Sequence, residues 1–70
     1  MGKVVRVAGL VIEANGPSVP IGDLCFIHIS DGYAPIPAEV VGFKEERILL
    51  MPIGELDRVR PGARVTASGL

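Results

Sequence analysis

The sequence is poor in the residues that carry most enzyme chemistry and metal binding. Its 70 residues include one cysteine, Cys25, and one histidine, His28. An internal disulfide needs a second cysteine, and a structural zinc site needs about four histidine or cysteine ligands. The phosphate-binding pattern G-x-x-x-x-G-K-[ST] does not occur in the sequence either. We therefore expect no catalytic residue, no cofactor-binding residue and no metal ligand.

Aromatic residues and blocks of like charge are also scarce. The chain has three aromatic residues, and its seven basic and eight acidic residues are interspersed, with a net charge of −1. Nucleic-acid-binding barrels need basic and aromatic side chains together on one face, so we expect no nucleic-acid partner. No apolar run is long enough to span a membrane, which predicts no direct membrane insertion. The lone cysteine and the absence of a signal-peptide pattern fit the cytoplasm.

What the sequence does contain is short apolar runs rich in valine, isoleucine and leucine, separated by nine glycines and six prolines. The clearest example is a pair of runs, Ala38–Phe43 and Ile48–Met51, that flank the charged segment 44–47 (KEER). Two β-rich runs around a short polar segment predict a β-hairpin. This hairpin indicates an all-β fold.

Other segments extend the same pattern. Lys3–Ala14 predicts one long strand, or two joined by a bend, with a bulge or barrel corner at Gly9. Asp23–Ser30 and Arg64–Ser68 predict two further strands, with Val65 and Ala67 pointing inward. A turn is expected at Asp31-Gly32, and 54–59 could hold one turn of helix. About six short strands and too few residues for two filled sheets predict a small closed six-stranded β-barrel, one domain spanning residues 1–70.

Several strands are apolar on both faces: Leu24–Ile29, Ala38–Phe43 and Ile48–Met51. Because the outside of a free barrel is normally polar, this indicates that loops or a neighbouring subunit cover part of it. Simple alternation groups Val5 and Val7 with Lys3. We expect an aspartate at Val41 or Leu50 to unfold the domain or to break its association.

Few polar residues stand out as candidate functional groups. His28 and Cys25 lie in an apolar strand, where an outward or polar-corner histidine and a buried cysteine are expected. Glu45 and Glu46 fit a solvated turn. Glu39 lies inside an apolar strand. It predicts either a buried or interface ion pair with Arg6, Arg47 or Arg64, or an outward charge that protects the surface; the sequence leaves both open.

Five segments together resemble the N-terminal β-barrel domain of the flagellar and type III secretion export ATPases. They are residues 2–14 (GKVVRVAGLVIEA), 21–25 (IGDLC), 38–43 (AEVVGF), 48–54 (ILLMPIG) and 60–65 (RPGARV), and they cover nearly the whole chain. These ATPases are similar to the catalytic and nucleotide-binding subunits of rotary ATP synthases.

The resemblance implies a non-catalytic barrel that forms a crown on a hexameric ring and supports ring assembly. The implied partner is a homo-oligomer formed through the barrel, with the ATPase domain of the parent protein. The implied location is cytoplasmic, with the parent peripheral at the inner-membrane export apparatus. The candidate interface residues are Arg6, Glu13 and Glu39.

The chain departs from the family pattern in three places. It begins at the barrel, it stops at Gly69-Leu70, and Asp57-Arg58-Val59 stands where a glycine often follows the aspartate. The first two departures predict an excised, reconstructed or designed domain. Two other interpretations remain open: a free-standing barrel that binds nucleic acid or peptide, and a designed barrel that serves as a folding module.

Overall fold

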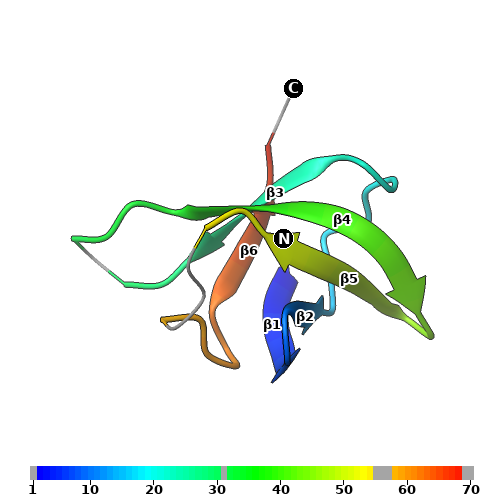
Figure 1. The fold of residues 1–70 in the computed structure, drawn as a ribbon, viewed down its shortest axis with the longest axis horizontal. Helices are drawn as coiled ribbons and strands as arrows, with labels where there is room; N and C mark the ends of the chain where they lie inside the picture. The colour runs from blue at the N-terminus through cyan, green and yellow to red at the C-terminus, as the bar shows by residue number, and fades with distance from the viewer. Residues whose placement is uncertain (1, 31, 55–57, 69–70) are drawn as a thin grey trace.

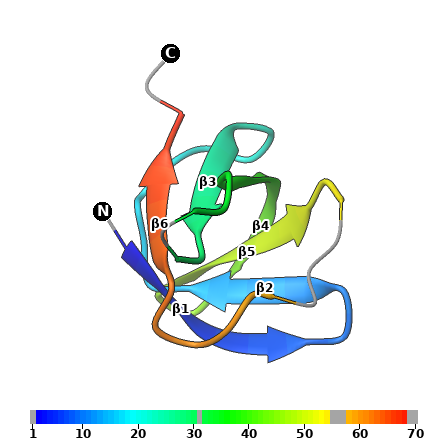
Figure 2. The same ribbon diagram turned by 90° about the vertical axis from the view of Figure 1, so that its left-hand side faces the viewer.

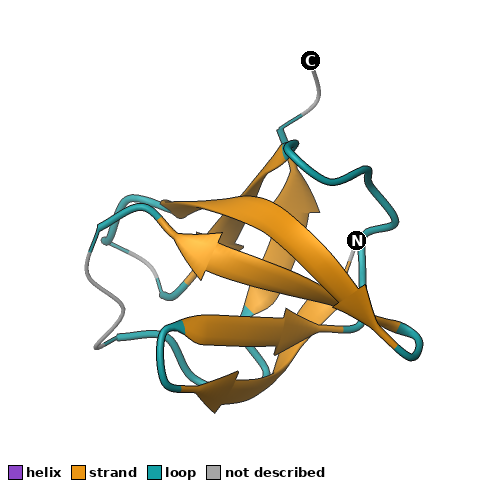
Figure 3. Ribbon diagram, turned by 45° about the vertical axis from the view of Figure 1, so that its right-hand side comes forward, coloured by secondary structure: helices purple, strands orange, loops and turns teal. Residues whose placement is uncertain are grey.

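Six antiparallel strands close into a barrel in the computed structural model, which describes residues 2–30, 32–54 and 58–68 (Figure 1). The strands are β1 (Gly2–Ala8), β2 (Val11–Ala14), β3 (Leu24–His28), β4 (Ile36–Lys44), β5 (Arg47–Pro52) and β6 (Arg64–Ala67). Their order around the barrel is β1-β2-β5-β4-β3-β6, and β6 pairs with β1 to close it (Figure 2). Figure 3 shows strands and loops, and no helix, in the described part of the chain. The predicted fold class is confirmed.

The hairpin of β4 and β5 is the longest pairing in the barrel and confirms the sequence prediction. Lys44 pairs with Arg47 across a two-residue turn made by Glu45 and Glu46. Glu45 has a φ of 57°. Two-residue turns with positive φ match the right-handed twist of the strands that they join. β4 begins at Ile36, earlier than predicted, because Ile36 and Pro37 pair with Ile27 and Phe26 of β3.

The segment 3–14 forms a second hairpin, which corrects the expected bend. Gly9, with a φ of 61°, and Leu10 form a turn in which Ala8 pairs with Val11. Gly9 is therefore neither a bulge nor a barrel corner, since the chain reverses direction there. A left-handed backbone at this position favours glycine because glycine has no Cβ.

The β-bulge of β1 lies at Val5, between the pairs Val4 with Ala14 and Arg6 with Glu13. A bulge inserts one unpaired residue and so shifts the alternation of side chains. Val4 and Val7 both pack in the core as a result, while Lys3 and Arg6 are exposed. The predicted grouping of Val5 and Val7 with Lys3 is therefore wrong.

A second bulge in β4 separates two neighbouring valines. Val40 pairs with Leu50, Gly42 pairs with Leu49, and Val41 is the extra residue between them. Val40 and Leu50 are fully buried, whereas Val41 is 39% exposed. The sequence predicts the same effect for an aspartate at Val41 and at Leu50. The structure instead places the two side chains on opposite sides of the barrel wall.

The barrel interior is filled by eleven small and medium-sized apolar side chains from all six strands and one loop: Val4, Ile12, Ala14, Cys25, Ile27, Ala38, Val40, Ile48, Leu50, Val59 and Val65. The predicted burial of Cys25 is thus confirmed, and Ile27 shares its inward face. Ala67 was expected to point inward but is exposed, because it is the last residue of β6 and lies at the rim.

The ends of β1 and β2 are held together by close backbone contacts. The Lys3 N–H donates to Asn15 Oδ1 at 2.8 Å, and the Asn15 N–H donates to the Lys3 carbonyl at 3.1 Å. Gly2 is buried there, and a Cβ on it would lie only 2.1 Å from the carbonyl oxygen of Gly16. Only glycine fits at this position.

Parts of the predicted connections lie outside the described residues. These are Asp31 of the expected turn and residues 55–57 of the expected helical turn, including Asp57 of the family departure. Val59, at the end of that connection, is buried and packs on the core. Over the described ranges, no helix has the length and apolar character needed to cross a membrane.

Candidate assembly surface

An exposed apolar surface surrounds Glu39 on the outside of the barrel. Leu24 of β3, Glu39 of β4 and Met51 of β5 are direct cross-strand neighbours and form one row. Leu24 is 39% exposed and Met51 is 45% exposed, and Glu39 is exposed between them. Ile21, in the loop before β3, and the bulge residue Val41 are also exposed. The Gly22 N–H donates to the Val40 carbonyl at 2.8 Å, which holds that loop against β4 and so places Ile21 near this row. We call Ile21, Leu24, Glu39, Val41 and Met51 the Glu39 face.

The Glu39 face agrees with the prediction that doubly apolar strands leave apolar side chains outside. Single apolar residues are common on surfaces, whereas a contiguous group with polar residues around it marks an interaction site. Val41 belongs to the group because alternation from the buried Val40 points its side chain outward.

A row of basic side chains lies on another part of the outer wall. Arg64 of β6 pairs with Lys3 of β1 on one side and with His28 of β3 on the other. Lys3 and Arg64 are exposed, and His28 is half-buried. Nε2 of His28 and Oγ1 of Thr66 are hydrogen-bonded at 2.8 Å, which fixes the imidazole against β6. We call Lys3, Arg64 and His28 the Arg64 row.

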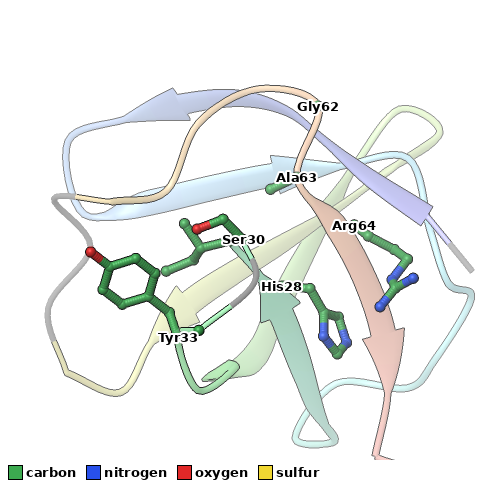
Figure 4. A pocket seen from close by; sticks show the side chains of 8 residues that line it. His28, Ser30, Tyr33, Gly62, Ala63 and Arg64 are labelled. Atoms are coloured by element: carbon green, nitrogen blue, oxygen red, sulfur yellow. The ribbon is translucent and has the colours of Figure 1, made fainter.

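The Arg64 row borders an open pocket of about 470 Å³ at one end of the barrel. His28 and Arg64 lie side by side on neighbouring strands at one edge of the pocket, and Ser30 and Tyr33 lie at the other (Figure 4). Gly62 and Ala63 of the loop before β6 line it as well. The Arg58 guanidinium stacks over the Tyr33 ring, 4.2 Å from its centroid, and joins the two loops at this end.

A third polar feature is an ion-pair cluster around Glu13 on the outside of β2. The Arg47 Nη1–H donates to Glu13 Oε1 at 2.9 Å, and Arg6 Nη1 lies 3.8 Å from Glu13 Oε2. The Glu13 side chain is 6% exposed, compared with 60% for Arg6 and 40% for Arg47. The hydrogen bond from Arg47, together with the positive charges of Lys44, Arg6 and Arg47, lowers the pKa of Glu13 below its ordinary value of 4.5, although partial burial opposes this.

The three candidate interface residues thus fall into two groups. Arg6 and Glu13 are brought together, while Glu39 lies on a different part of the wall. Within the described residues Glu39 forms no ion pair with Arg6, Arg47 or Arg64, and Glu13 is the partner of both Arg6 and Arg47. An ion pair of Glu39 across an interface stays a prediction. The other expectation, an outward charge on Glu39, is confirmed. That Arg6, Glu13 and Glu39 contact a neighbouring subunit stays a prediction.

Sequence reasoning missed the Arg64 row. Arg64 and Thr66 were expected to point outward, but strand order was needed to place Lys3 and His28 on either side of Arg64. The Arg58–Tyr33 contact was missed for the same reason, because it joins two loops that are far apart in the chain.

The residues that could carry catalysis are placed as the sequence predicted. Cys25 is fully buried, and burial, with the negative charge of Asp23 adding to it, raises the pKa of its thiol. A thiol in this state is a poor nucleophile. Within the described ranges, no three histidine, cysteine, aspartate or glutamate side chains gather as a metal site would require.

The fold is a closed six-stranded antiparallel β-barrel whose outer wall carries an exposed apolar surface and a row of basic side chains. The family model of the ATP synthase alpha/beta family, beta-barrel domain, matches residues 4–69. The chain therefore belongs to this family, as its β-barrel domain.

The similar proteins are bacterial export ATPases. The chain is 54% identical over 69 residues to a flagellum-specific ATP synthase of Bacillus subtilis, covering 97% of the chain and 16% of that protein. It is 40% identical over 68 residues to a type 3 secretion system ATPase of Xanthomonas euvesicatoria, covering 97% of the chain and 15% of that protein. The chain thus spans about a sixth of the length of these relatives.

A solved structure shows the same fold. The assembled ATPase EscN from the enteropathogenic E. coli type III secretion system superposes with a TM-score of 0.77 at 26% identity, over 99% of this chain and 16% of that one. The same ATPase in complex with its central stalk EscO gives a TM-score of 0.77 at 25% identity, over 97% of this chain and 16% of that one. The resemblance to the N-terminal barrel of the flagellar and type III secretion ATPases is confirmed.

Proposed function

We propose that this barrel is a non-catalytic assembly domain of a protein-export ATPase and supports formation of its hexameric ring. Membership of the beta-barrel family, with export ATPases as relatives, is the observation that carries the proposal. The alternative of a free-standing or designed module is not favoured, because the barrel makes up about a sixth of these relatives.

The structure supports an assembly role through its outer wall. Leu24, Val41 and Met51 are apolar and exposed on adjacent strands, where contact with another protein surface would remove them from water. In this proposal the ATPase domain of the parent protein adds further contact area, and the parent works in the cytoplasm at the inner-membrane export apparatus.

The first test is the solution mass of the purified chain by light scattering, from micromolar to millimolar concentration. We expect a discrete oligomer to grow with concentration. A monomer throughout would contradict assembly by the barrel and would leave ring formation to the ATPase domain.

A second measurement tests the non-catalytic part of the proposal. We expect no release of phosphate from ATP by the pure chain above the rate in buffer. Reproducible ATP turnover that follows the barrel through gel filtration would overturn it.

A further inference from the structure

We propose that a second copy of this chain docks head to tail on the Glu39 face, with its Lys3 and Arg64 placed against Glu39. This inference rests on the proposed assembly function and names the two surfaces that would carry it.

The charge of Glu39 constrains what can cover the Glu39 face. Glu39 takes part in none of the described ion pairs and stands among exposed apolar side chains. Any partner that covers those apolar residues also takes the Glu39 carboxylate out of water, which is costly unless a cation meets it. A suitable partner therefore carries a basic group opposite Glu39.

The barrel itself carries basic side chains that could meet Glu39. Lys3 and Arg64 are exposed cross-strand neighbours, and neither takes part in a described ion pair. Like charges directly opposite each other destabilise a strand pair. A carboxylate placed between them would relieve that repulsion, so each surface supplies what the other lacks.

The Glu39 face and the Arg64 row lie at different positions around the outer wall of the barrel. The Glu39 face is centred on β4 and the Arg64 row on β6, and β3 alone lies between those strands in the barrel order. The two surfaces are therefore different and lie about a third of the way around the barrel from each other, as Figure 2 lets the reader follow.

Contact between two different surfaces is heterologous and produces a ring when the rotation closes. In a six-membered ring, the directions from one subunit to its two neighbours form an angle of about 120°. Two strand positions in a barrel of six strands are separated by about the same angle around the barrel axis. The separation of the two surfaces thus suits a closed ring of barrels.

The test uses charge reversal on each surface, in the 70-residue chain. Glu39→Lys and Arg64→Glu each place like charges at the contact, so we expect each variant to self-associate about tenfold or more weakly than the wild type. Association is measured by light scattering and by the concentration dependence of amide NMR shifts. Glu46→Lys and Arg60→Glu, exposed loop positions with the same charge changes, are the matched controls and should associate like the wild type.

Mixing the two variants gives the sharpest result. In an equimolar mixture, Glu39 of one variant meets Arg64 of the other, and the introduced lysine meets the introduced glutamate. We expect association to return to near the wild-type level, and the doubly substituted chain to associate with itself. Thermal unfolding of each variant checks that it is folded, with Glu39→Gln and Arg64→Gln as milder substitutions.

The failures are distinguishable. If the wild type associates but both reversals behave like their controls, or if mixing does not restore association, the two surfaces are wrong and the proposed function stands. If the wild type stays monomeric at millimolar concentration, self-association through the barrel fails in both proposals. If the reversals weaken association and mixing restores it, the head-to-tail contact is supported.

Discussion

An aspartate at Val40 and one at Val41 should have very different effects, although the two positions are adjacent in the chain. Val40 is fully buried, so Val40→Asp loses about 1.5–3 kcal/mol of side-chain burial. A fully buried carboxyl can raise its pKa by about 3–5 units. At pH 7 this costs about 4 kcal/mol at most, because the carboxyl protonates once its folded-state pKa reaches the pH. The sum of about 6–7 kcal/mol is of the same size as the whole free energy of unfolding of a 70-residue domain, about 4–10 kcal/mol. We expect Val40→Asp to be unfolded at pH 7.

Val41→Asp keeps its carboxylate in water, because this residue lies on the outer side of the barrel wall and is 39% exposed. We expect a loss of about 1–2 kcal/mol in the free energy of unfolding, from the buried part of the valine alone, and a folded domain. Urea unfolding followed by far-UV circular dichroism measures both variants under the same conditions. Equal stability of the two variants, or a Val41→Asp that unfolds while Val40→Asp folds, would refute the assignment of the inner face.

Three further predictions follow from the contacts described above. Because the folded-state pKa of Glu13 is lowered, the contribution of Glu13 to stability is present above the ordinary carboxyl pKa and is lost as pH falls through the lowered value. The melting temperatures of the wild type and Glu13→Gln should therefore differ at pH 7 and converge in acid. A difference that stays constant with pH would contradict the ion pairs with Arg6 and Arg47. Cys25 should resist alkylation by iodoacetamide in the native domain and react quickly in denaturant, as followed by mass spectrometry, whereas rapid labelling of the native chain would contradict its burial. Gly2→Ala should lower the free energy of unfolding by roughly 1–3 kcal/mol or more, because its methyl group would collide with Gly16. Gly42→Ala is the control and should melt near the wild type, because its methyl group meets only a Leu49 side-chain carbon at 3.6 Å. Similar melting temperatures of the two variants would show that the β1 terminus is not tightly packed.

The candidate surfaces were only partly predictable. An outward Glu39 was one of two expectations, and the apolar residues around it were expected from strands that are apolar on both faces. Pairing Leu24 with Glu39 and Met51, however, requires the register of three strands. The ion pairs of Glu13 with Arg6 and Arg47 were not predicted from the sequence. The bulge at Val5 brings Arg6 beside Glu13 on the outer wall. A bulge inserts one residue into a strand, and in this chain both inserted residues are ordinary valines. The residue types along the strand therefore do not reveal where the alternation shifts.

The sequence by itself determined the fold class, the hairpin of β4 and β5, the burial of Cys25 and the family. These are local properties: β-branched runs, turn residues and motifs that are read along the chain. The tertiary structure decided which residues lie beside each other across strands that are distant in sequence. It placed Lys3, Arg64 and His28 in one row and Leu24, Glu39 and Met51 in another. The reason is physical: where both faces of a strand are apolar, burial does not fix its orientation, and closure of the barrel with its two bulges makes that choice.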